Sequence, residues 1–297
     1  MPAAKLANKK GDENMPAEVR PPQKGDFKVK ISLYSLSCGD KKPREIIELA
    51  LKYGCSGIEW WCRENGHIDA NNLEKSSKDV ALMMEKTGLE VAGIAPYFKY
   101  NEPAEEVAKI FRAAKILGTK RVRCNSHPFK GEEPFAELMQ RQIDWLEKEV
   151  LPVVMELDMQ LNIEQHHNMI CCNANACLQM VEKFPPERIG IIYDPGNSLF
   201  EGFTSTEYSL SVMGRYINHV HVKSARYVKE GGTLPRGRLL PMEFCSLERG
   251  DLNWEEIIKQ LKETGYKGFL SLEALDKRDT ETKLSEDIPY IRNILAK

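Results

Sequence analysis

The sequence predicts an α/β protein in which eight strand–helix units close into a (β/α)₈ TIM barrel. Three observations lead to this fold class. Short apolar, β-rich segments alternate with amphipathic helical segments throughout the chain after residue 26, and this alternation indicates a parallel sheet. The count of eight units favours a closed barrel, and no G-x-G-x-x-G follows the first strand, which removes the main signal of a dinucleotide-binding fold.

The chain divides into a tail and one domain. Residues 1–26 are rich in Lys, Pro, Glu and Gly and contain no apolar signal core, so we expect a flexible N-terminal tail. Residues 27–297 have the length of one barrel, and we expect them to form a single catalytic domain.

The expected strands are short apolar runs rich in β-branched and aromatic residues. In chain order they are residues 28–34, 57–61, 90–97, 120–125, 161–165, 189–194, 217–223 and 268–275. The expected helices share an amphipathic pattern. In chain order they are residues 43–54, 76–88, 104–118, 134–158, 173–184, 204–215, 253–265 and 279–296.

Local signals justify the helix ends. Glycine ends the first two helices, as is common at the C-terminus of a helix. The third helix begins with acidic residues and has Lys115 near its end, as the helix dipole favours. Pro152 bends the fourth helix or starts a new one, and Asn173 and Asn253 are N-caps. The segment 204–215 has the weakest helical pattern.

Composition limits the class of protein. The 42 basic and 44 acidic residues give a net charge of −2, which argues against a nucleic-acid or membrane-surface binder. No apolar run approaches the roughly 18–20 residues of a membrane span. Eight cysteines occur without a C-x-x-C pair, so we expect free thiols in the cytoplasm. A homo-oligomer is left open.

Ionisable residues stand late in five of the expected strands. They are Glu59, Glu164, Asp194, His221 and Glu273. In a barrel, functional groups lie at the carboxyl ends of the strands, so these side chains meet at one mouth. Buried charge is costly unless it is paired or binds a metal ion. Carboxylates with an imidazole indicate one divalent ion, with Mn²⁺ first and Mg²⁺, Co²⁺ or Zn²⁺ as alternatives.

The segment INHVHVK places His219, His221 and Lys223 at alternate positions of one strand. Alternate residues share a face, and two residues rise about 6.6 Å. We therefore expect His221 to reach the mouth as a ligand, His219 to support it one layer deeper, and Lys223 to lie at the rim beside the substrate.

Four segments together resemble the sugar phosphate isomerase/epimerase family, which includes xylose isomerase-like and D-tagatose 3-epimerase-like barrels. They are IEQHHN, YDPGN, INHVHVK and LERGDLNWEEIIKQLKETGYKGFLSLE. Their order and spacing carry the resemblance, which covers residues 27–297. It implies that Glu164, Asp194, His221 and Glu273 bind the metal ion, and that Glu164 and Glu273 also act as the acid and base.

Such a site implies chemistry next to a carbonyl. A metal ion on the carbonyl and a neighbouring hydroxyl acidifies the C–H between them, and a carboxylate removes that proton to give an enediolate. Return of the proton yields epimerisation or isomerisation, whereas loss of a β-hydroxyl is dehydration. We expect an isomerase or epimerase acting on a keto sugar. A dehydratase or lyase acting on a 3-keto-glycoside or inosose is the alternative.

The chain departs from the epimerase pattern at three positions. Asn197 stands where a substrate-binding His is expected, Ile170 where a Glu is expected, and Arg226 one residue before the expected substrate Arg. An endonuclease IV-like nuclease is disfavoured, because it needs more His ligands and a basic excess. A non-catalytic carbohydrate-binding barrel is the remaining rival.

Polar and aromatic residues near the expected mouth are candidates for contact with the substrate. They are Glu59, Trp61, His127, His167, Asn197, Lys223 and Arg226. Trp61 shares the inward side of its strand with Glu59 and is placed to stack on a sugar ring, whereas Trp60 faces the helices. The expected partner is a small sugar or keto sugar, with no nucleic acid and no membrane.

Overall fold

A computed structural model of the chain describes residues 29–202, 204–228 and 242–297. The expected tail at residues 1–26 lies outside these described residues.

Within the described residues, eight parallel strands close into the predicted barrel, because β1 pairs with both β2 and β11. Around the barrel the strands are β1 (Lys30–Tyr34), β2 (Gly57–Arg63), β4 (Glu90–Ala95), β5 (Arg121–Cys124), β6 (Gln160–Glu164), β7 (Ile189–Tyr193), β8 (Ile217–Val222) and β11 (Phe269–Leu272). The short β3 (Ile68–Asp69) pairs in parallel with the last two residues of β2.

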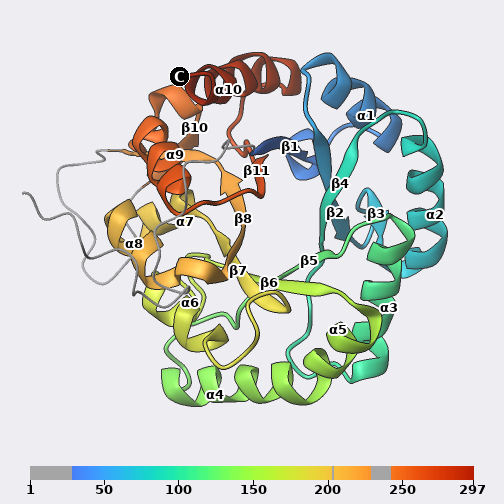
Figure 1. The fold of residues 1–297 in the computed structure, drawn as a ribbon, viewed down its shortest axis with the longest axis vertical. Coiled ribbons are helices and arrows are strands. Elements are labelled where there is room, and N and C mark those ends of the chain that lie inside the picture. Colours follow the sequence, from blue (N-terminus) through green and yellow to red (C-terminus); the bar gives the residue numbers. More distant parts are fainter. Residues whose placement is uncertain (1–28, 203, 229–241) are drawn as a thin grey trace, which may run out of the picture.

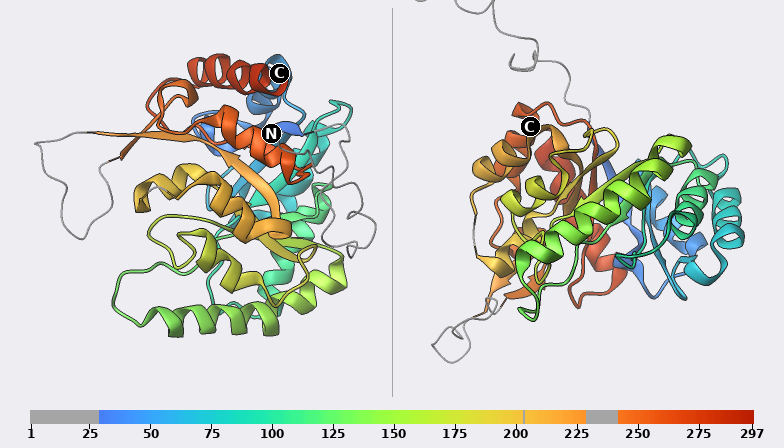
Figure 2. Two further views of the ribbon diagram at one scale, coloured as in Figure 1. Left: turned by 60° about the vertical axis from the view of Figure 1, so that its left-hand side comes forward. Right: turned by 90° about the horizontal axis from the view of Figure 1, so that it is seen from below.

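Helices surround the strands and cover the outside of the barrel (Figures 1 and 2). They are α1 (Pro43–Lys52), α2 (Leu73–Met84), α3 (Ala104–Ile116), α4 (Phe135–Trp145), α5 (Leu151–Leu157), α6 (Ala174–Val181), α7 (Pro195–Glu201), α8 (Thr206–Met213), α9 (Trp254–Glu263) and α10 (Thr280–Leu295). Two predicted N-caps are confirmed: the side chain of Asn173 accepts a hydrogen bond from the backbone of Ala176, and Asn253 accepts one from Glu256.

The alternating side chains of β2 show which residues face the surrounding helices and which face the barrel interior. Ile58 and Trp60 are fully buried, and the indole Nε1 of Trp60 donates to Met84 Sδ of α2 at 3.3 Å. Trp60 therefore packs against the helices, as expected. The intervening residues Glu59, Trp61 and Arg63 face the barrel interior, since successive strand residues point to opposite faces.

The structure differs from the expected elements in three places. The segment 134–158 is interrupted by a π-helical turn at Leu146–Val150 before α5, which has Pro152 in its first turn. The sequence pattern missed α7, which begins directly after β7. The segment after β8 also forms an antiparallel strand pair, β9 (Ser224–Tyr227) with β10 (Met242–Cys245).

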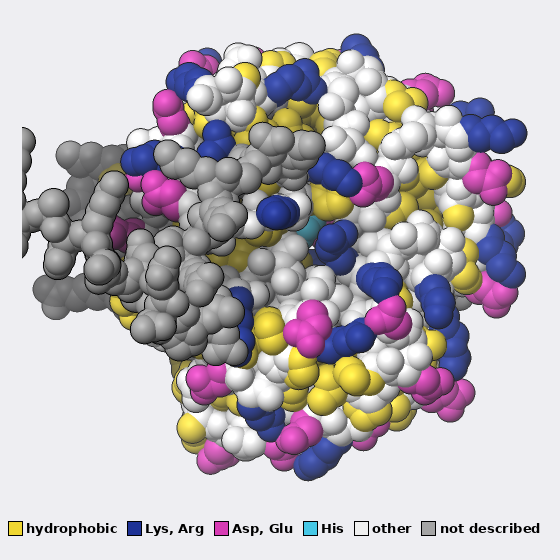
Figure 3. Space-filling view, viewed as in Figure 1, with side chains coloured by type: hydrophobic (Ala, Val, Ile, Leu, Met, Phe, Trp, Pro, Cys, Tyr) yellow, Lys and Arg dark blue, Asp and Glu magenta, His cyan; other side chains and the backbone are white. Residues whose placement is uncertain are grey.

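Figure 3 shows the face at which the barrel strands begin, with Lys and Arg side chains around its centre. A hollow of about 390 Å³ at this face is lined by residues that include Arg121, Arg215 and Lys267. The opposite face carries the strand ends and the predicted site. None of the helices in the described ranges is long and apolar enough to cross a membrane.

Candidate functional site

The four proposed metal ligands lie at the carboxyl ends of four barrel strands. Glu164 is the last residue of β6, Asp194 follows β7, His221 is the penultimate residue of β8, and Glu273 follows β11. All four side chains are buried. Residues distant in sequence therefore come together, because parallel strands bring their carboxyl ends to one rim.

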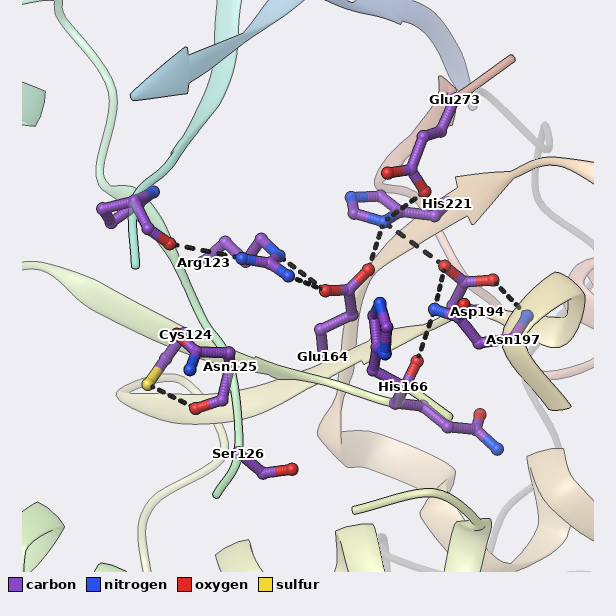
Figure 4. A network of polar contacts seen from close by, with 12 residues as sticks. Arg123, Cys124, Asn125, Ser126, Glu164, His166, Asp194, Asn197, His221 and Glu273 are labelled. Carbon is purple, nitrogen blue, oxygen red and sulfur yellow. Dashed lines mark hydrogen bonds and ion pairs between the residues drawn. The ribbon is translucent and has the colours of Figure 1, made fainter. Parts of the chain in front are cut away.

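The three carboxylates point toward one nitrogen of His221 (Figure 4). Nδ1 of His221 lies 3.1 Å from Glu164 Oε1, 3.6 Å from Asp194 Oδ2 and 3.5 Å from Glu273 Oε2. One ligand atom from each of the four residues lies within 4.8 Å of the others.

This donor set fits a divalent ion. Ligand atoms held about 2.0–2.2 Å from one ion lie roughly 3–4 Å from each other, and the observed separations fall in that range. Three carboxylate oxygens and one imidazole nitrogen suit Mn²⁺, Mg²⁺ and Zn²⁺. Burial alone lowers the pKa of His221, but the surrounding Glu59 and Glu273 charges raise it well above its usual value, so the pocket attracts positive charge.

The segment YDPGN positions Asp194. Its side chain caps α7 by accepting from the backbone N–H of Asn197 at 2.9 Å, and Pro195 occupies the first turn. Gly196 is required by close packing, since a Cβ there would lie 2.5 Å from Cγ of Lys223. The start of α7 thus fixes the Asp194 carboxylate at the end of β7.

Arg123 of β5 is a buried partner that sequence reasoning missed. Its Nε donates to Glu164 Oε2 at 2.6 Å, and its Nη1 donates to the carbonyl of Pro96 at 3.2 Å. Burial alone would raise the pKa of Glu164, but the Arg123 guanidinium together with His221 holds that pKa well below its usual value. The sequence signal for Arg123 as a buried partner is its position. It follows Arg121 by two residues, late in an apolar strand, and faces inward.

Lys223 lies inside the site, not at its rim. Its side chain is buried, and Nζ lies 2.7 Å from Glu273 Oε2 and 2.8 Å from Asp194 Oδ2. Burial would lower the pKa of Lys223, but these two carboxylates raise it. Lys223 in turn lowers the pKa of Glu273 against the effect of burial.

Glu59 and His219 form a layer beneath the ligands. Glu59 is the third of the seven residues of β2, because the strand extends to Arg63 and not only to residue 61 as expected. Its carboxylate accepts from Ser271 Oγ at 2.6 Å and lies 3.0 Å from His219 Nε2 and 3.2 Å from His221 Nε2. Glu59 is enclosed by protein groups and is placed to orient His221, not to contact a substrate.

Other candidate contact residues surround the mouth without joining the cluster. Trp61 is half-buried, and its ring packs edge-on against His67. His127 stacks on Tyr100 with 4.3 Å between ring centroids. His167 stacks on Phe200.

Asn197 is turned inward. Its amide nitrogen donates to Asp194 Oδ2 at 2.8 Å and to the carbonyl of Gln165 at 3.0 Å, and its Oδ1 lies 2.9 Å from His167 Nδ1. These contacts use the whole amide, so the structure gives Asn197 a supporting place behind Asp194.

Arg226 is separate from the site. It lies on β9, and its Nε donates to Glu243 Oε1 of β10 at 2.6 Å with both side chains about half exposed. His166, by contrast, lies near Glu164 (Figure 4). The two adjacent histidines of IEQHHN are the sequence signal for polar groups at this position.

The chain matches a family model over residues 47–294, described as Xylose isomerase-like TIM barrel. The chain belongs to this family. The match covers the strands that supply all four proposed ligands, and it confirms the resemblance predicted from the sequence.

Solved structures share the fold of this family member at low sequence identity. A probable 3-DHS dehydratase, AsbF, from Bacillus anthracis is 17% identical with a TM-score of 0.70, and the alignment covers 91% of this chain and 99% of that one. A xylose isomerase-like TIM barrel protein from Mycobacterium smegmatis in complex with magnesium is 14% identical, with a TM-score of 0.70 and coverage of 90% and 96%. A sugar phosphate isomerase/epimerase from Parabacteroides distasonis is 14% identical, with a TM-score of 0.65 and coverage of 95% and 100%.

No curated protein is a significant sequence match to this chain. The structures named above establish the shared fold, and reactions differ among proteins of one fold.

Proposed function

We propose that this protein is a divalent-metal-dependent isomerase or epimerase that acts on a keto sugar by removing a proton next to the carbonyl. The observation that carries this proposal is the convergence of Glu164, Asp194 and Glu273 on Nδ1 of His221. Mn²⁺ is the proposed ion. When bound, the ion supplies a Lewis acid that stabilises negative charge on the substrate oxygens.

Glu164 and Glu273 are the proposed proton-transfer pair. Each is held ionised by a buried cation, Arg123 for Glu164 and Lys223 for Glu273. An ionised carboxylate next to the substrate can accept a proton from carbon, and its protonated form can return it. Because the two residues come from different strands, they approach a substrate from different sides, which is what inversion at one carbon requires.

Glu59 supports this proposal by fixing the ring of His221. A His ligand commonly donates its second N–H to a carboxylate, which leaves the other nitrogen free to bind the ion. Nε2 of His221 lies 3.2 Å from Glu59. With an ion bound at Nδ1, this contact would hold the remaining ring proton on Nε2.

Dehydration of a 3-keto-glycoside or inosose is the second candidate, and Lys223 is the observation that favours it. Its ammonium group lies in the site within 2.8 Å of Asp194 and Glu273. An ammonium group can donate a proton to a departing β-hydroxyl.

All eight cysteines are unpaired, which supports the proposed location in the reducing cytoplasm.

The test of proton abstraction is a screen of keto sugars in deuterated water with the purified protein and added Mn²⁺. We expect deuterium at a carbon next to the carbonyl of recovered substrate or product, and the product identity distinguishes isomerisation from dehydration. Full activity after complete removal of metal would overturn the proposal.

Substitution of the carboxylates tests their roles. We expect Glu164→Gln and Glu273→Gln each to lower kcat by at least about 100-fold, because an amide cannot accept the proton. Glu243→Gln, which changes an exposed carboxylate outside the site, is the matched control. Near-normal kcat in either site variant removes that residue from the proton-transfer pair.

A further inference from the structure

Arg63, at the end of β2, is a cation without a counter-ion among the residues that the structure describes. Among the described residues, its guanidinium has no hydrogen-bond or ion-pair partner, and Nε is buried and unsatisfied. The other two cations near the cluster differ, since Arg123 is bound to Glu164 and Lys223 to Asp194 and Glu273. A half-buried unpaired Arg is costly unless a ligand supplies the missing negative charge.

The surroundings of Arg63 link it to the proposed site. Its guanidinium stacks on the ring of Tyr97, which follows β4. The guanidinium of Arg123 lies 5.1 Å from the centroid of the same ring, and Arg123 binds Glu164 (Figure 4). Burial lowers the pKa of Arg63 to about 10, and the charge of Arg123 acts in the same direction.

The position of Arg63 along β2 places its side chain toward the mouth of the barrel. Glu59, Trp61 and Arg63 share the inward face of β2, with about 6.6 Å between successive members. Glu59 lies beneath the ligand cluster, so Arg63 lies about two layers nearer the mouth. Arg63 and Tyr97 also line a groove of about 1020 Å³ that extends between α2 and α3, so a charged group can reach Arg63 from solvent.

We propose that Arg63, supported by Tyr97, binds an anionic group of the substrate, so that the keto sugar carries a carboxylate or a phosphate. This inference rests on the proposed function, because it assigns the substrate class of the same site. The planar guanidinium can hold two oxygens of either anion at once, and the stacked ring keeps it oriented. The distal anion would then place the carbonyl end of the sugar toward Glu164 and Glu273.

Binding measurements with probes that differ only at one end of the sugar test this inference. We titrate three probes calorimetrically into the full chain with Mn²⁺ present. They are fructose, fructose 6-phosphate and the fructose derivative in which carbon 6 is a carboxylate. We expect at least about tenfold tighter binding of one charged probe than of fructose. The preferred charged probe identifies phosphate or carboxylate as the natural group.

Three variants separate a specific contact from a general charge effect. We expect Arg63→Gln to abolish the preference, and Arg63→Lys to retain part of it because the charge remains without the planar fork. Arg112→Gln removes an exposed cation that lines the same groove from α3, and it should keep the full preference. Equal losses of this preference in Arg63→Gln and Arg112→Gln overturn the assignment. The assignment is also overturned if the wild type shows no preference for the charged probes, or if none of the probes binds at millimolar concentration.

The binding measurements test the anion site separately from the proton-transfer chemistry of the proposed function. Binding through Arg63 requires no proton transfer, so a chain that prefers a charged probe yet never incorporates deuterium retains the anion site and loses the proposed function. Deuterium exchange at equal rates in all three sugars, unchanged by Arg63→Gln, retains the function and overturns the anion site.

Discussion

His167 is half-buried between the ring of Phe200 and the amide of Asn197. Burial lowers the pKa of His167 to about 4, and the neighbouring His166 acts in the same direction. An unfolded His has a pKa of about 6.5. Above pH 6.5 both states are neutral at this residue. Between pH 6.5 and 4 the unfolded chain takes up a proton that the folded chain does not, so the free energy of unfolding falls as the pH falls.

We therefore expect His167→Gln to lose less stability than the wild type between pH 7 and pH 4.5, because Gln can donate to Asn197 without titrating. Urea unfolding at the two pH values measures the difference, and the other buried histidines remain in both proteins. Parallel losses in the two proteins would show that His167 does not titrate in this range.

At the residue scale, the sequence could predict the convergence of the four proposed ligands but not their protein partners. Glu164, Asp194, His221 and Glu273 follow from the positions of strand ends. The pairing of Arg123 with Glu164 depends on how two neighbouring strands align across 41 residues of chain. The inward turn of Asn197 depends on the cap of a helix, α7, that the periodicity did not reveal.

At the scale of elements, Arg278 joins the segment after β11 to α10. Its Nη2 donates to Asp287 Oδ2 at 2.6 Å and to Asp276 Oδ2 at 2.8 Å. Asp287 is buried and also accepts from the backbone N–H of Leu247. The last helix is therefore fixed to the end of the strand that precedes Glu273.

Removal of Arg278 should leave the buried Asp287 without its cation. We expect Arg278→Met to lower the free energy of unfolding by about 2–3 kcal/mol, since breaking a buried pair leaves an uncompensated charge. Arg226→Met, which breaks an exposed pair with Glu243, should change it little. Chemical denaturation of both variants measures the effect, and equal small changes would mean that α10 is held by apolar packing alone.

Helices with strong periodicity, such as α3 and α9, were predictable as elements. The helix α7 was not, because its seven residues are too few to show a period and its N-cap, Asp194, was interpreted only as a ligand. The pair β9–β10 was also missed, since its partners are separated by a long polar connection.

At the scale of the whole molecule, the proposed ligand cluster predicts that metal binding stabilises the fold. An ion that binds only the folded barrel stabilises it by about 2.7 kcal/mol at a concentration 100 times its Kd. We expect Mn²⁺ to raise the Tm of the wild type and a chelator to reverse the change. Differential scanning fluorimetry at several Mn²⁺ concentrations measures it.

Two histidine variants make this measurement specific. His221→Ala should abolish the Mn²⁺-dependent rise in Tm and lower the bound metal content. His219→Ala should lower the starting Tm but retain most of the rise, because His219 contacts Glu59 in the layer below. The reverse result would assign the ligand to His219.

The pairing of β1 with β11 has a consequence for how the chain folds. Ile31 lies beside Leu270, so the barrel closes only after almost the whole chain is available. Contacts of such long sequence separation make folding slow, because the ends of a long loop must be brought together first. Until closure, the apolar edges of β1 and β8 are exposed to other chains. We expect closure to be the late, rate-limiting step of folding, and Glu273 to be the last proposed ligand to reach the site.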